Sequence, residues 1–172
     1  MRVHLVNPSD VSFGTAVITP RWLYVLAAAT PDQFGVPNIV DETLEPFDVE
    51  QVRRGDVVGI GIHTSNALRG YAVGRLARTR GAFVVFGGIH PTLFPDEARE
   101  HGAAHSVVSG DGDLVWPQVL ADCAAGTLKP SAMPPAEMPR NCGQSTPGRG
   151  AVAVAAASDR LQARMPVAAG AK

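Results

Sequence analysis

Two histidines stand where a side chain could do chemistry. His63 follows the apolar run 57–62, and His90 follows the apolar run 83–86 and two glycines. A pair of imidazoles can bind a metal ion or transfer protons near neutral pH. A histidine at the end of a strand is more often a simple hydrogen-bonding residue. We therefore favour that role for both, and keep a small acid–base enzyme as an alternative.

Acidic and nucleophilic residues form no self-contained active site either. Asp111 and Asp113 alternate with Gly110 and Gly112 in a turn, without the further oxygen ligands at loop spacing that a calcium site needs. The chain lacks G-x-S-x-G and G-x-x-x-x-G-K-[ST], and no G-x-G-x-x-G follows the first apolar run. A serine hydrolase, a P-loop nucleotide site and a dinucleotide site are all disfavoured.

Glycines interrupt two of the most apolar segments. Gly59 and Gly61 lie two residues apart, on one face of a strand over 57–62, and Gly87 and Gly88 directly follow the run 83–86. A missing Cβ permits either a tight turn and a close helix contact or the approach of a flat ligand. The residues alone leave both readings open.

The segments that carry these residues alternate between strand and helix. Because five such alternations with short connections require parallel strands, we expect helices on both faces of one sheet. The predicted fold is α/β, a doubly wound, Rossmann-like or flavodoxin-like domain with a five-stranded parallel sheet. Its strands are expected at 3–6, 38–41, 57–62, 83–86 and 107–108. A short helix is expected at 48–54, and the helix ending near Arg80 is expected to bury Leu68, Ala72, Val73 and Leu76.

Ligands of an open parallel sheet bind beyond the carboxyl ends of its strands. The loops at those ends share small residues and hydroxyl or amide side chains, and the glycine loops hold no lysine or arginine. The predicted site is therefore polar and narrow, and phosphate is not its obvious target. These loops span 7–14, 63–66, 87–92 and 110–113.

Length, charge and cysteine content narrow the class of protein. The 172 residues suffice for one domain, and a net charge of -1 without a basic run argues against nucleic acid or a membrane surface as the main partner. With no apolar segment of spanning length, we expect a cytoplasmic protein. Cys123 and Cys142 lack C-x-x-C spacing, and Cys123 is expected to be buried on a helix. Residues 130–172, rich in alanine, proline and glycine, are expected to form a flexible tail behind a domain at 1–129.

Three stretches together carry a family resemblance. Residues 85–92 read VFGGIHPT, residues 95–98 read PDEA, and residues 107–113 read VVSGDGD, followed by Trp116 and Pro117. This combination resembles the amino-terminal cobalamin-binding domain of B12-dependent radical S-adenosylmethionine enzymes, over about residues 1–129. Family members carry GGxHPT-like, PEEA-like and GEGE-like segments; this chain has aspartate where glutamate is usual.

The resemblance implies a place for the cofactor. The corrin would lie across the carboxyl edge of the sheet, with its nucleotide tail beside the glycine strands. Related cobalamin proteins carry D-x-H-x-x-G after the first strand, and Ser12 takes the place of that histidine here. The resemblance therefore implies cobalt held by the corrin, with no protein histidine ligand. The implied cobalamin-binding residues are Asn7, Pro8, Ser12, Gly59, Gly61, Thr64, Ser65, Gly87, Gly88, His90, Pro91, Thr92, Gly110, Asp111 and Gly112.

The chain departs from this family in its cysteines. The radical enzymes continue into a barrel with C-x-x-x-C-x-x-C, and no such motif is present here. We expect a truncated form that binds cobalamin without an iron–sulfur cluster, catalyses nothing alone and works with a separate radical S-adenosylmethionine chain. A receiver-like or flavin-binding regulatory domain on the same fold is the alternative. A receiver should show paired acids after the first strand, where Asp10 stands alone.

Overall fold

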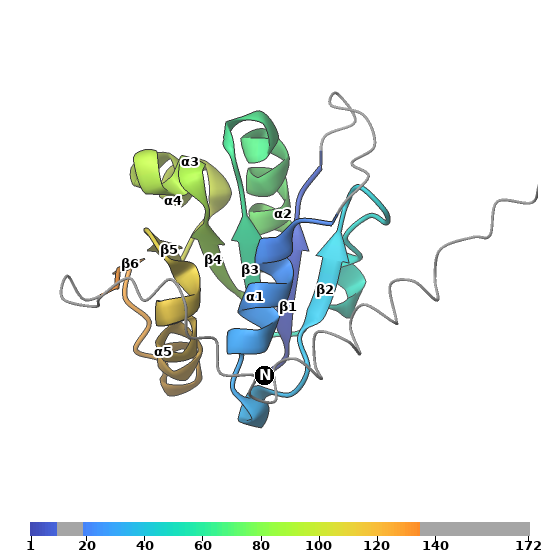
Figure 1. The fold of residues 1–172 in the computed structure, drawn as a ribbon. Helices are drawn as coiled ribbons and strands as arrows, with labels where there is room; N and C mark the ends of the chain where they lie inside the picture. Colours follow the sequence, from blue (N-terminus) through green and yellow to red (C-terminus); the bar gives the residue numbers. More distant parts are fainter. Residues whose placement is uncertain (10–18, 135–172) are drawn as a thin grey trace, which may run out of the picture.

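The central sheet has six parallel strands. The computed structural model describes residues 1–9 and 19–134, and in this part of the chain the strand order is β2-β1-β3-β4-β5-β6 (Figure 1). The order reverses between β1 and β3, and β2 and β6 are the edge strands. The strands are β1 (Val3–Asn7), β2 (Asn38–Asp41), β3 (Val57–Gly61), β4 (Phe83–Gly87), β5 (Ser106–Val108) and β6 (Ser131–Ala132).

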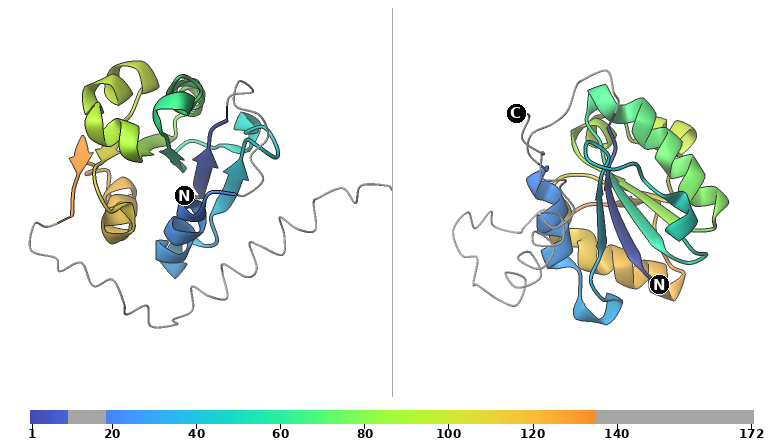
Figure 2. Two further views of the ribbon diagram at one scale, coloured as in Figure 1. Left: turned by 45° about the horizontal axis from the view of Figure 1, so that its top comes forward. Right: turned by 90° about the vertical axis from the view of Figure 1, so that its right-hand side faces the viewer.

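Helices cover both faces of the sheet (Figure 2). α1 (Arg21–Ala29) and α5 (Gly112–Ala125) pack against each other on one face. α2 (Ala67–Thr79) and α4 (Pro95–Gly102) pack against each other on the opposite face. The short helix α3 (Ile89–Leu93) follows β4 at the carboxyl edge of the sheet. The segment expected to be the His90 loop is therefore helical.

The pleat of the strands decides which core each residue enters. Val57 belongs to the core under α1 and α5, whereas Val58 belongs to the core under α2 and α4. Side chains alternate along a strand, so Gly59 and Gly61 share the side of Val57. Gly61 lies opposite Gly87 in the register of β3 and β4. The three glycines therefore face α1 and α5.

The expected doubly wound α/β fold is confirmed, but the sheet has six strands where five were expected. β6 lies beyond residue 129, in the segment expected to be a tail, and pairs with β5 through Val107↔Ser131 and Val108↔Ala132. The β3-α2-β4 and β5-α5-β6 connections both lead to the next strand in the same direction across the sheet, but α2 and α5 lie on opposite faces. The β5-α5-β6 connection therefore has the opposite handedness to the β3-α2-β4 connection. The rest of the expected tail, 135–172, lies outside the described residues.

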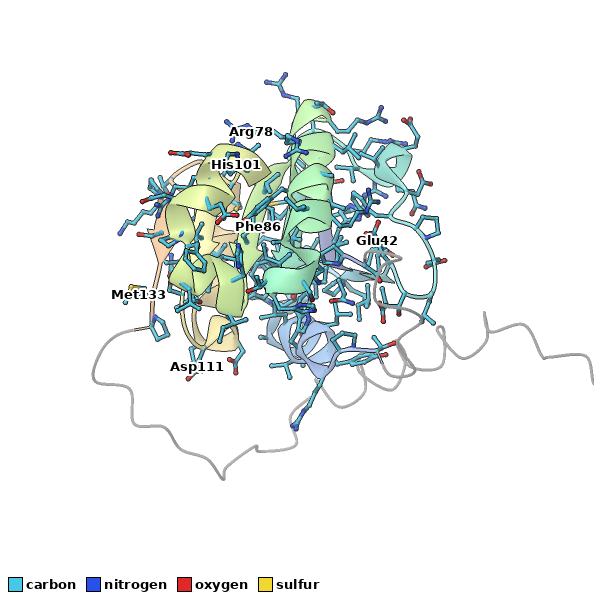
Figure 3. All side chains as sticks on the ribbon, turned by 90° about the horizontal axis from the view of Figure 1, so that it is seen from above. Glu42, Arg78, Phe86, His101, Asp111 and Met133 are labelled. Carbon is cyan, nitrogen blue, oxygen red and sulfur yellow. The ribbon has the colours of Figure 1, made fainter. Side chains whose placement is uncertain are left out.

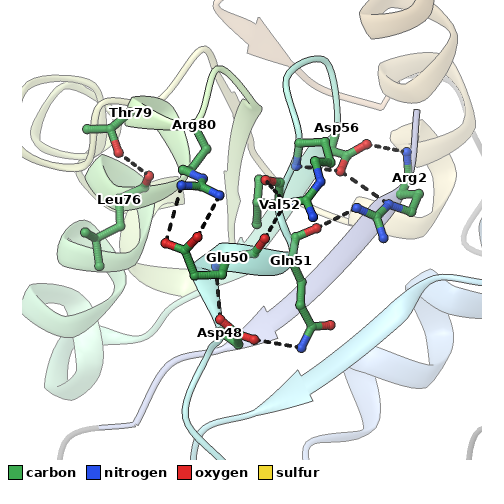
Figure 4. Close-up of polar contacts among 10 residues, drawn as sticks. Arg2, Asp48, Glu50, Gln51, Val52, Asp56, Leu76, Thr79 and Arg80 are labelled. Carbon is green, nitrogen blue, oxygen red and sulfur yellow. Dashed lines mark hydrogen bonds and ion pairs between the residues drawn. The ribbon is translucent and has the colours of Figure 1, made fainter.

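The helix expected at 48–54 is only a 3₁₀ turn, η3 (Val49–Gln51). The Asp48 carboxylate caps it, because it accepts hydrogen bonds from the Glu50 backbone N–H and from Gln51 Nε2, both at 3.0 Å (Figure 4). Asp56 then accepts the Arg53 N–H at 2.9 Å, which turns the chain into β3. Two further 3₁₀ turns, η2 (Asp32–Phe34) and η4 (Thr64–Asn66), precede β2 and α2.

The buried face of α2 agrees only in part with the expected one, since Val73 is buried as expected. Leu68 and Leu76 are 79% and 43% exposed, whereas Gly70 and Gly74 are buried. A Cβ on Gly74 would collide with the backbone oxygen of Gly102, so α2 contacts α4 through a glycine. The helix has turned its small residues inward and its leucines outward.

Candidate functional site

A cavity of about 340 Å³ opens between α1 and α5, over β3 and β4. Helix α1 and the amino-terminal half of α5 form its walls, and the glycine strands form its floor. The lining is mostly apolar, and among the described residues that line it only His63 and Asp113 are titratable. The main lining residues are Trp22, Val25, Leu26, Gly59, Gly61, His63, Val85, Gly87, Val108, Gly112, Asp113 and Trp116.

Two tryptophans rest on the glycines of β3. A Cβ on Gly61 would lie 2.5 Å from Cζ2 of Trp22, and a Cβ on Gly59 would lie 2.9 Å from Cη2 of Trp116. Both distances are too short for any side chain. The glycines of β3 therefore serve to admit the two indole rings against the sheet, and the rings form the aromatic walls of the cavity.

Trp116 is held firmly in this position. Its side chain is buried, and Nε1 donates a hydrogen bond of 2.9 Å to Oγ1 of Thr30 at the end of α1. Thr30 Oγ1 in turn donates to the backbone oxygen of Leu26 at 2.9 Å. This chain of hydrogen bonds joins the two helices that wall the cavity. Trp22 is half-buried and lies on the first turn of α1.

Gly87 and Gly88 are glycines for different reasons. Gly88 has φ +102°, and a Cβ there would collide with the backbone oxygen of Ile62. Its glycine is therefore required by the backbone. A Cβ on Gly87 would meet nothing nearer than Cβ of Val108 at 4.0 Å, and Gly87 faces the cavity. Gly87 is thus the glycine whose missing side chain leaves free space.

His90 is not brought into the cavity. The side chain is buried, and its ring nitrogens lie 3.2 Å from Thr64 Oγ1 and 3.1 Å from the Tyr71 hydroxyl, with a Glu97 carboxylate oxygen at 3.5 Å. Burial raises the pKa of Tyr71 to about 12, with Glu97 adding to the shift, so this hydroxyl stays protonated. His90 and Thr64 thus fix α3 against α2 and η4. The predicted hydrogen-bonding role of His90 is confirmed.

The other residues of the 87–92 segment serve the turn itself. Thr92 Oγ1 donates to the backbone oxygen of Gly88 at 2.8 Å, within α3. Pro91 is buried in the same helix. Neither residue lines the cavity. The segment between β4 and α4 is therefore mainly a structural connection, which reaches the cavity through Gly88 and Ile89 directly after Gly87.

His63 and Ser65 form a pair at the rim. Both are exposed, and Ser65 Oγ lies 2.6 Å from Nδ1 of His63. The backbone N–H of His63 donates to Oδ1 of Asn66 at 2.9 Å, and Asn66 Nδ2 donates to the backbone oxygen of Pro8 at 2.8 Å. The buried Asn66 thus ties the rim of β3 to the end of β1.

The end of β1 lies outside the cavity. Asn7 is buried and donates from Nδ2 to Oδ1 of Asp41 at 3.0 Å, across the β1–β2 pair. Asp41 Oδ1 also accepts the backbone N–H and the hydroxyl of Thr43. Asn7 and Pro8 are therefore structural contacts in this arrangement. Ser12 lies outside the described residues.

In the turn before α5, the glycines contribute more to the cavity lining than the aspartates do. Gly110, with φ +82°, and Gly112 line the cavity, as does Asp113. Asp111 is exposed, and Figure 3, which looks onto the carboxyl edge of the sheet, shows its side chain at the periphery of the domain. Of the predicted site residues, Gly59, Gly61, Gly87, Gly88, Gly110 and Gly112 converge on one cavity.

Sequence reasoning missed the walls of the cavity. Trp22 was not among the predicted site residues, and Trp116 entered only through the family resemblance. A signal was available: each of the two tryptophans in the chain lies in an apolar helix, and glycines at two-residue spacing in a central strand leave room for a ring of that size. Val25 and Leu26 complete the wall on α1.

Metal and thiol chemistry find no support among the described side chains. Within residues 1–9 and 19–134, no group of three or more His, Cys, Asp or Glu side chains is placed to hold a metal ion. Cys123 is buried as expected, and burial raises the pKa of its thiol to about 12, so it is not a thiolate at neutral pH. No helix in those ranges combines the length and apolar character needed to cross a membrane.

Comparison with known proteins extends this picture. The chain is 33% identical over 114 residues to bacteriochlorophyllide d C-12(1)-methyltransferase of Chlorobaculum tepidum, and 36% identical over 110 residues to bacteriochlorophyllide d C-8(2)-methyltransferase of the same organism. These curated relatives are methyltransferases. The matches cover 66% and 62% of this chain but 24% and 23% of the relatives, so the chain spans about a quarter of their length. No protein-family model matches the chain.

A solved structure supports the fold. The radical S-adenosylmethionine methyltransferase TsrM from Kitasatospora setae, solved with tryptophan substrate and an analogue of S-adenosylmethionine, aligns with a TM-score of 0.58. The alignment covers 72% of this chain and 26% of TsrM at 22% identity. At that identity the likeness concerns the α/β architecture.

Proposed function

We propose that the α/β domain binds cobalamin, with the nucleotide tail of the cofactor in the α1–α5 cavity and the corrin over the carboxyl edge of the sheet. The observation that carries this proposal is the cavity itself, whose floor is open at Gly87 and whose walls include two indole rings. A benzimidazole nucleotide ends in a flat aromatic group, which suits a largely apolar cavity with Trp22 and Trp116 in its walls. Gly87 supplies the place on the floor that a Cβ would fill.

The size and chemistry of the cavity agree with this assignment. A volume of about 340 Å³ is at the lower end for small-molecule pockets, so it admits a nucleotide tail but leaves a corrin ring outside. No lysine or arginine is present among the described residues that line it. A ligand that buries its phosphate, as P-loop and dinucleotide ligands do, is poorly matched. The neutral aromatic end of the tail is well matched.

The comparisons support a role in methyl transfer. Both curated relatives are methyltransferases, and the matches cover 66% and 62% of this chain. When bound, cobalamin would supply a cobalt centre that can carry a methyl group. In this proposal the residues described here hold and orient the cofactor, and an iron–sulfur partner, on a separate chain or a further segment, supplies the radical chemistry. Cys123, the cysteine among the described residues, is buried and cannot contribute to a cluster.

The experiment that tests binding uses the full 172-residue chain with hydroxocobalamin. Cobalamin should pass through a desalting column with the protein, and its absorbance spectrum should change as the benzimidazole leaves the cobalt. Flavin mononucleotide, run in parallel, tests the regulatory-domain alternative. Co-elution of flavin without cobalamin, or a cobalamin spectrum unaffected by the protein, would reject the proposal.

A pair of variants then tests the place of binding. Gly87→Leu projects a branched side chain into the free space of the cavity floor, and we expect it to weaken cobalamin binding at least about tenfold, or ~1.4 kcal/mol. Ala28→Leu adds a leucine on the exposed side of α1 and should leave the affinity unchanged. Equal affinity of the two variants would place the ligand elsewhere. Gly88 is unsuitable for this test, because any side chain there strains the backbone.

A further inference from the structure

His63 combines a rim position with a ring nitrogen that no described residue engages. It directly follows β3, lines the mouth of the cavity and is exposed. Ser65 holds Nδ1 at 2.6 Å, and no hydrogen bond or ion pair from residues 1–9 or 19–134 engages Nε2. One nitrogen is thus anchored and the other is available. This is the arrangement that metal-ligating histidines use, since a partner on the second nitrogen fixes the tautomer and the ring.

The support beneath His63 is rigid. The Asn66 side chain holds the backbone of His63 and is itself anchored to the backbone oxygen of Pro8. Asn66 is only 5% exposed, so this link is protected from water. A ligand placed on such a support loses little freedom on binding.

The other imidazoles of the chain are differently placed. His90 has both ring nitrogens within hydrogen-bond distance of Thr64 and Tyr71 and is buried. His105 accepts the backbone N–H of Val84, and His4 is buried beside Asp56. His101 lies in the last turn of α4, outside the cavity lining. His63 is therefore the imidazole that a ligand over the rim would meet.

We propose that Nε2 of His63 binds the lower face of the cobalt when cobalamin is bound. This inference rests on the proposed function: placing the nucleotide tail in the cavity takes the benzimidazole away from the cobalt and leaves its lower coordination position to a solvent water. The Nε2 lone pair forms the new bond and a solvent water leaves, with no change in the oxidation state of cobalt. The Nδ1 proton is then donated to Ser65 Oγ, as a neutral ligating imidazole requires.

The proposal changes what Ser12 was taken to mean. The serine after the first strand implied that no protein histidine reaches cobalt, because related proteins supply the imidazole from that loop. His63 would supply it from the loop after β3, one strand away in the sheet. The ligand would still be an imidazole, supplied by the loop after β3 in place of the loop after β1.

Electron paramagnetic resonance tests the bond directly. The full chain, grown with ¹⁵N-histidine and loaded with unlabelled cobalamin, is reduced to the cob(II)alamin state. A ligating protein imidazole splits each cobalt line into a doublet, whereas the benzimidazole nitrogen of the cofactor gives a triplet. We expect the doublet, its loss in His63→Gln and its retention in His101→Gln, with cobalamin still bound by both variants.

Each other result has a definite reading. Bound cobalamin with no nitrogen splitting, or a doublet that survives in His63→Gln, overturns the role of His63 and leaves the proposed function standing. A triplet in the labelled protein means that the benzimidazole stays on cobalt, which overturns both the place of the tail and the role of His63. If no cobalamin binds to the parent chain, the proposed function fails and this inference fails with it.

Discussion

The indole of Trp116 lies on Gly59: its Cη2 atom is 2.9 Å from the position that a Cβ on that glycine would take. Helix α5 can approach β3 this closely because the strand has no side chain there. The contact sets the depth of the cavity, since the ring forms one wall and the glycine forms part of the floor. The packing of helix α5 on the sheet and the shape of the cavity therefore depend on the same pair of residues.

We expect Gly59→Ala to destabilise the domain by about 1–3 kcal/mol, because the added methyl group must displace a buried ring that Thr30 holds in place. Gly87→Ala is the matched control, with the nearest atom at 4.0 Å, and should change the free energy of unfolding by less than about 0.5 kcal/mol. Urea denaturation of both variants measures the difference. Equal stability of the two would contradict the close packing of Trp116 on β3.

Thr30→Val removes the acceptor of the Trp116 N–H and leaves a buried donor unpaired. The expected loss of stability is about 1–3 kcal/mol. Thr79→Val makes the same chemical change where the hydroxyl donates to the backbone oxygen of Leu76 in an exposed position, as Figure 4 shows. Water replaces that bond, so thermal unfolding of Thr79→Val should match the parent. A large loss in Thr79→Val, or none in Thr30→Val, would refute this account.

His105 makes stability depend on pH. Burial, with a smaller contribution from Arg78, lowers the pKa of His105 below its usual 6.5, and its Nδ1 accepts the Val84 N–H at 3.0 Å, which requires an unprotonated nitrogen. Between the folded and unfolded pKa values the unfolded chain binds more protons. The contribution of His105 to the free energy of unfolding is therefore fully present above the unfolded pKa. It is lost as the pH falls below 6.5 toward the folded pKa.

The measurement is the free energy of unfolding across this range of pH. We expect His105→Gln to flatten part of the slope, while His4, whose pKa is also lowered by burial against the opposing effect of Asp56, retains the remainder. An unchanged slope in His105→Gln would exclude His105 as a source of the pH dependence.

Arg69 balances a buried carboxylate. The Glu42 side chain is 3% exposed, and its Oε2 accepts from Arg69 Nε at 2.8 Å. Arg69→Met leaves that charge without its cation, and since the arginine is itself a third exposed we expect a loss of about 1–3 kcal/mol. Arg80→Met is the control, because its partner Glu50 is 73% exposed and such pairs contribute about 0–1 kcal/mol. Comparable losses in chemical denaturation would show that burial of Glu42 is not what matters.

Apolar runs bounded by glycine and polar residues were enough to predict the sheet. The runs at 57–62 and 83–86 are β3 and β4, and the alternation of strand with helix led to the parallel doubly wound order. Strand β6 was not predicted, because Ser131 and Ala132 carry no apolar pattern. Their pairing with β5 also depends on a connection of unusual handedness. Local sequence does not encode such a long-range pairing.

Side-chain direction limited what could be said of the site. All six predicted glycines line the cavity, since their place within or after a strand follows from the positions of the strands alone. His90, Asn7 and Thr64 do not, because each is turned toward a buried partner in the neighbouring structure that spacing along the chain does not reveal. The predicted burial of Leu68 and Leu76 was wrong for a similar reason, because Gly70 and Gly74 allow a closer helix contact than leucine does.

The placement of Trp22 and Trp116 on the glycine strand also gives the protein a built-in optical probe. The chain has two tryptophans, and both form walls of the same cavity. Intrinsic emission excited at the indole band therefore comes from the walls of the cavity alone, and an absorbing cofactor in the cavity would quench it by energy transfer. Titration of unlabelled protein can thus follow occupancy directly, and Trp22→Phe and Trp116→Phe would separate the α1 wall from the α5 wall.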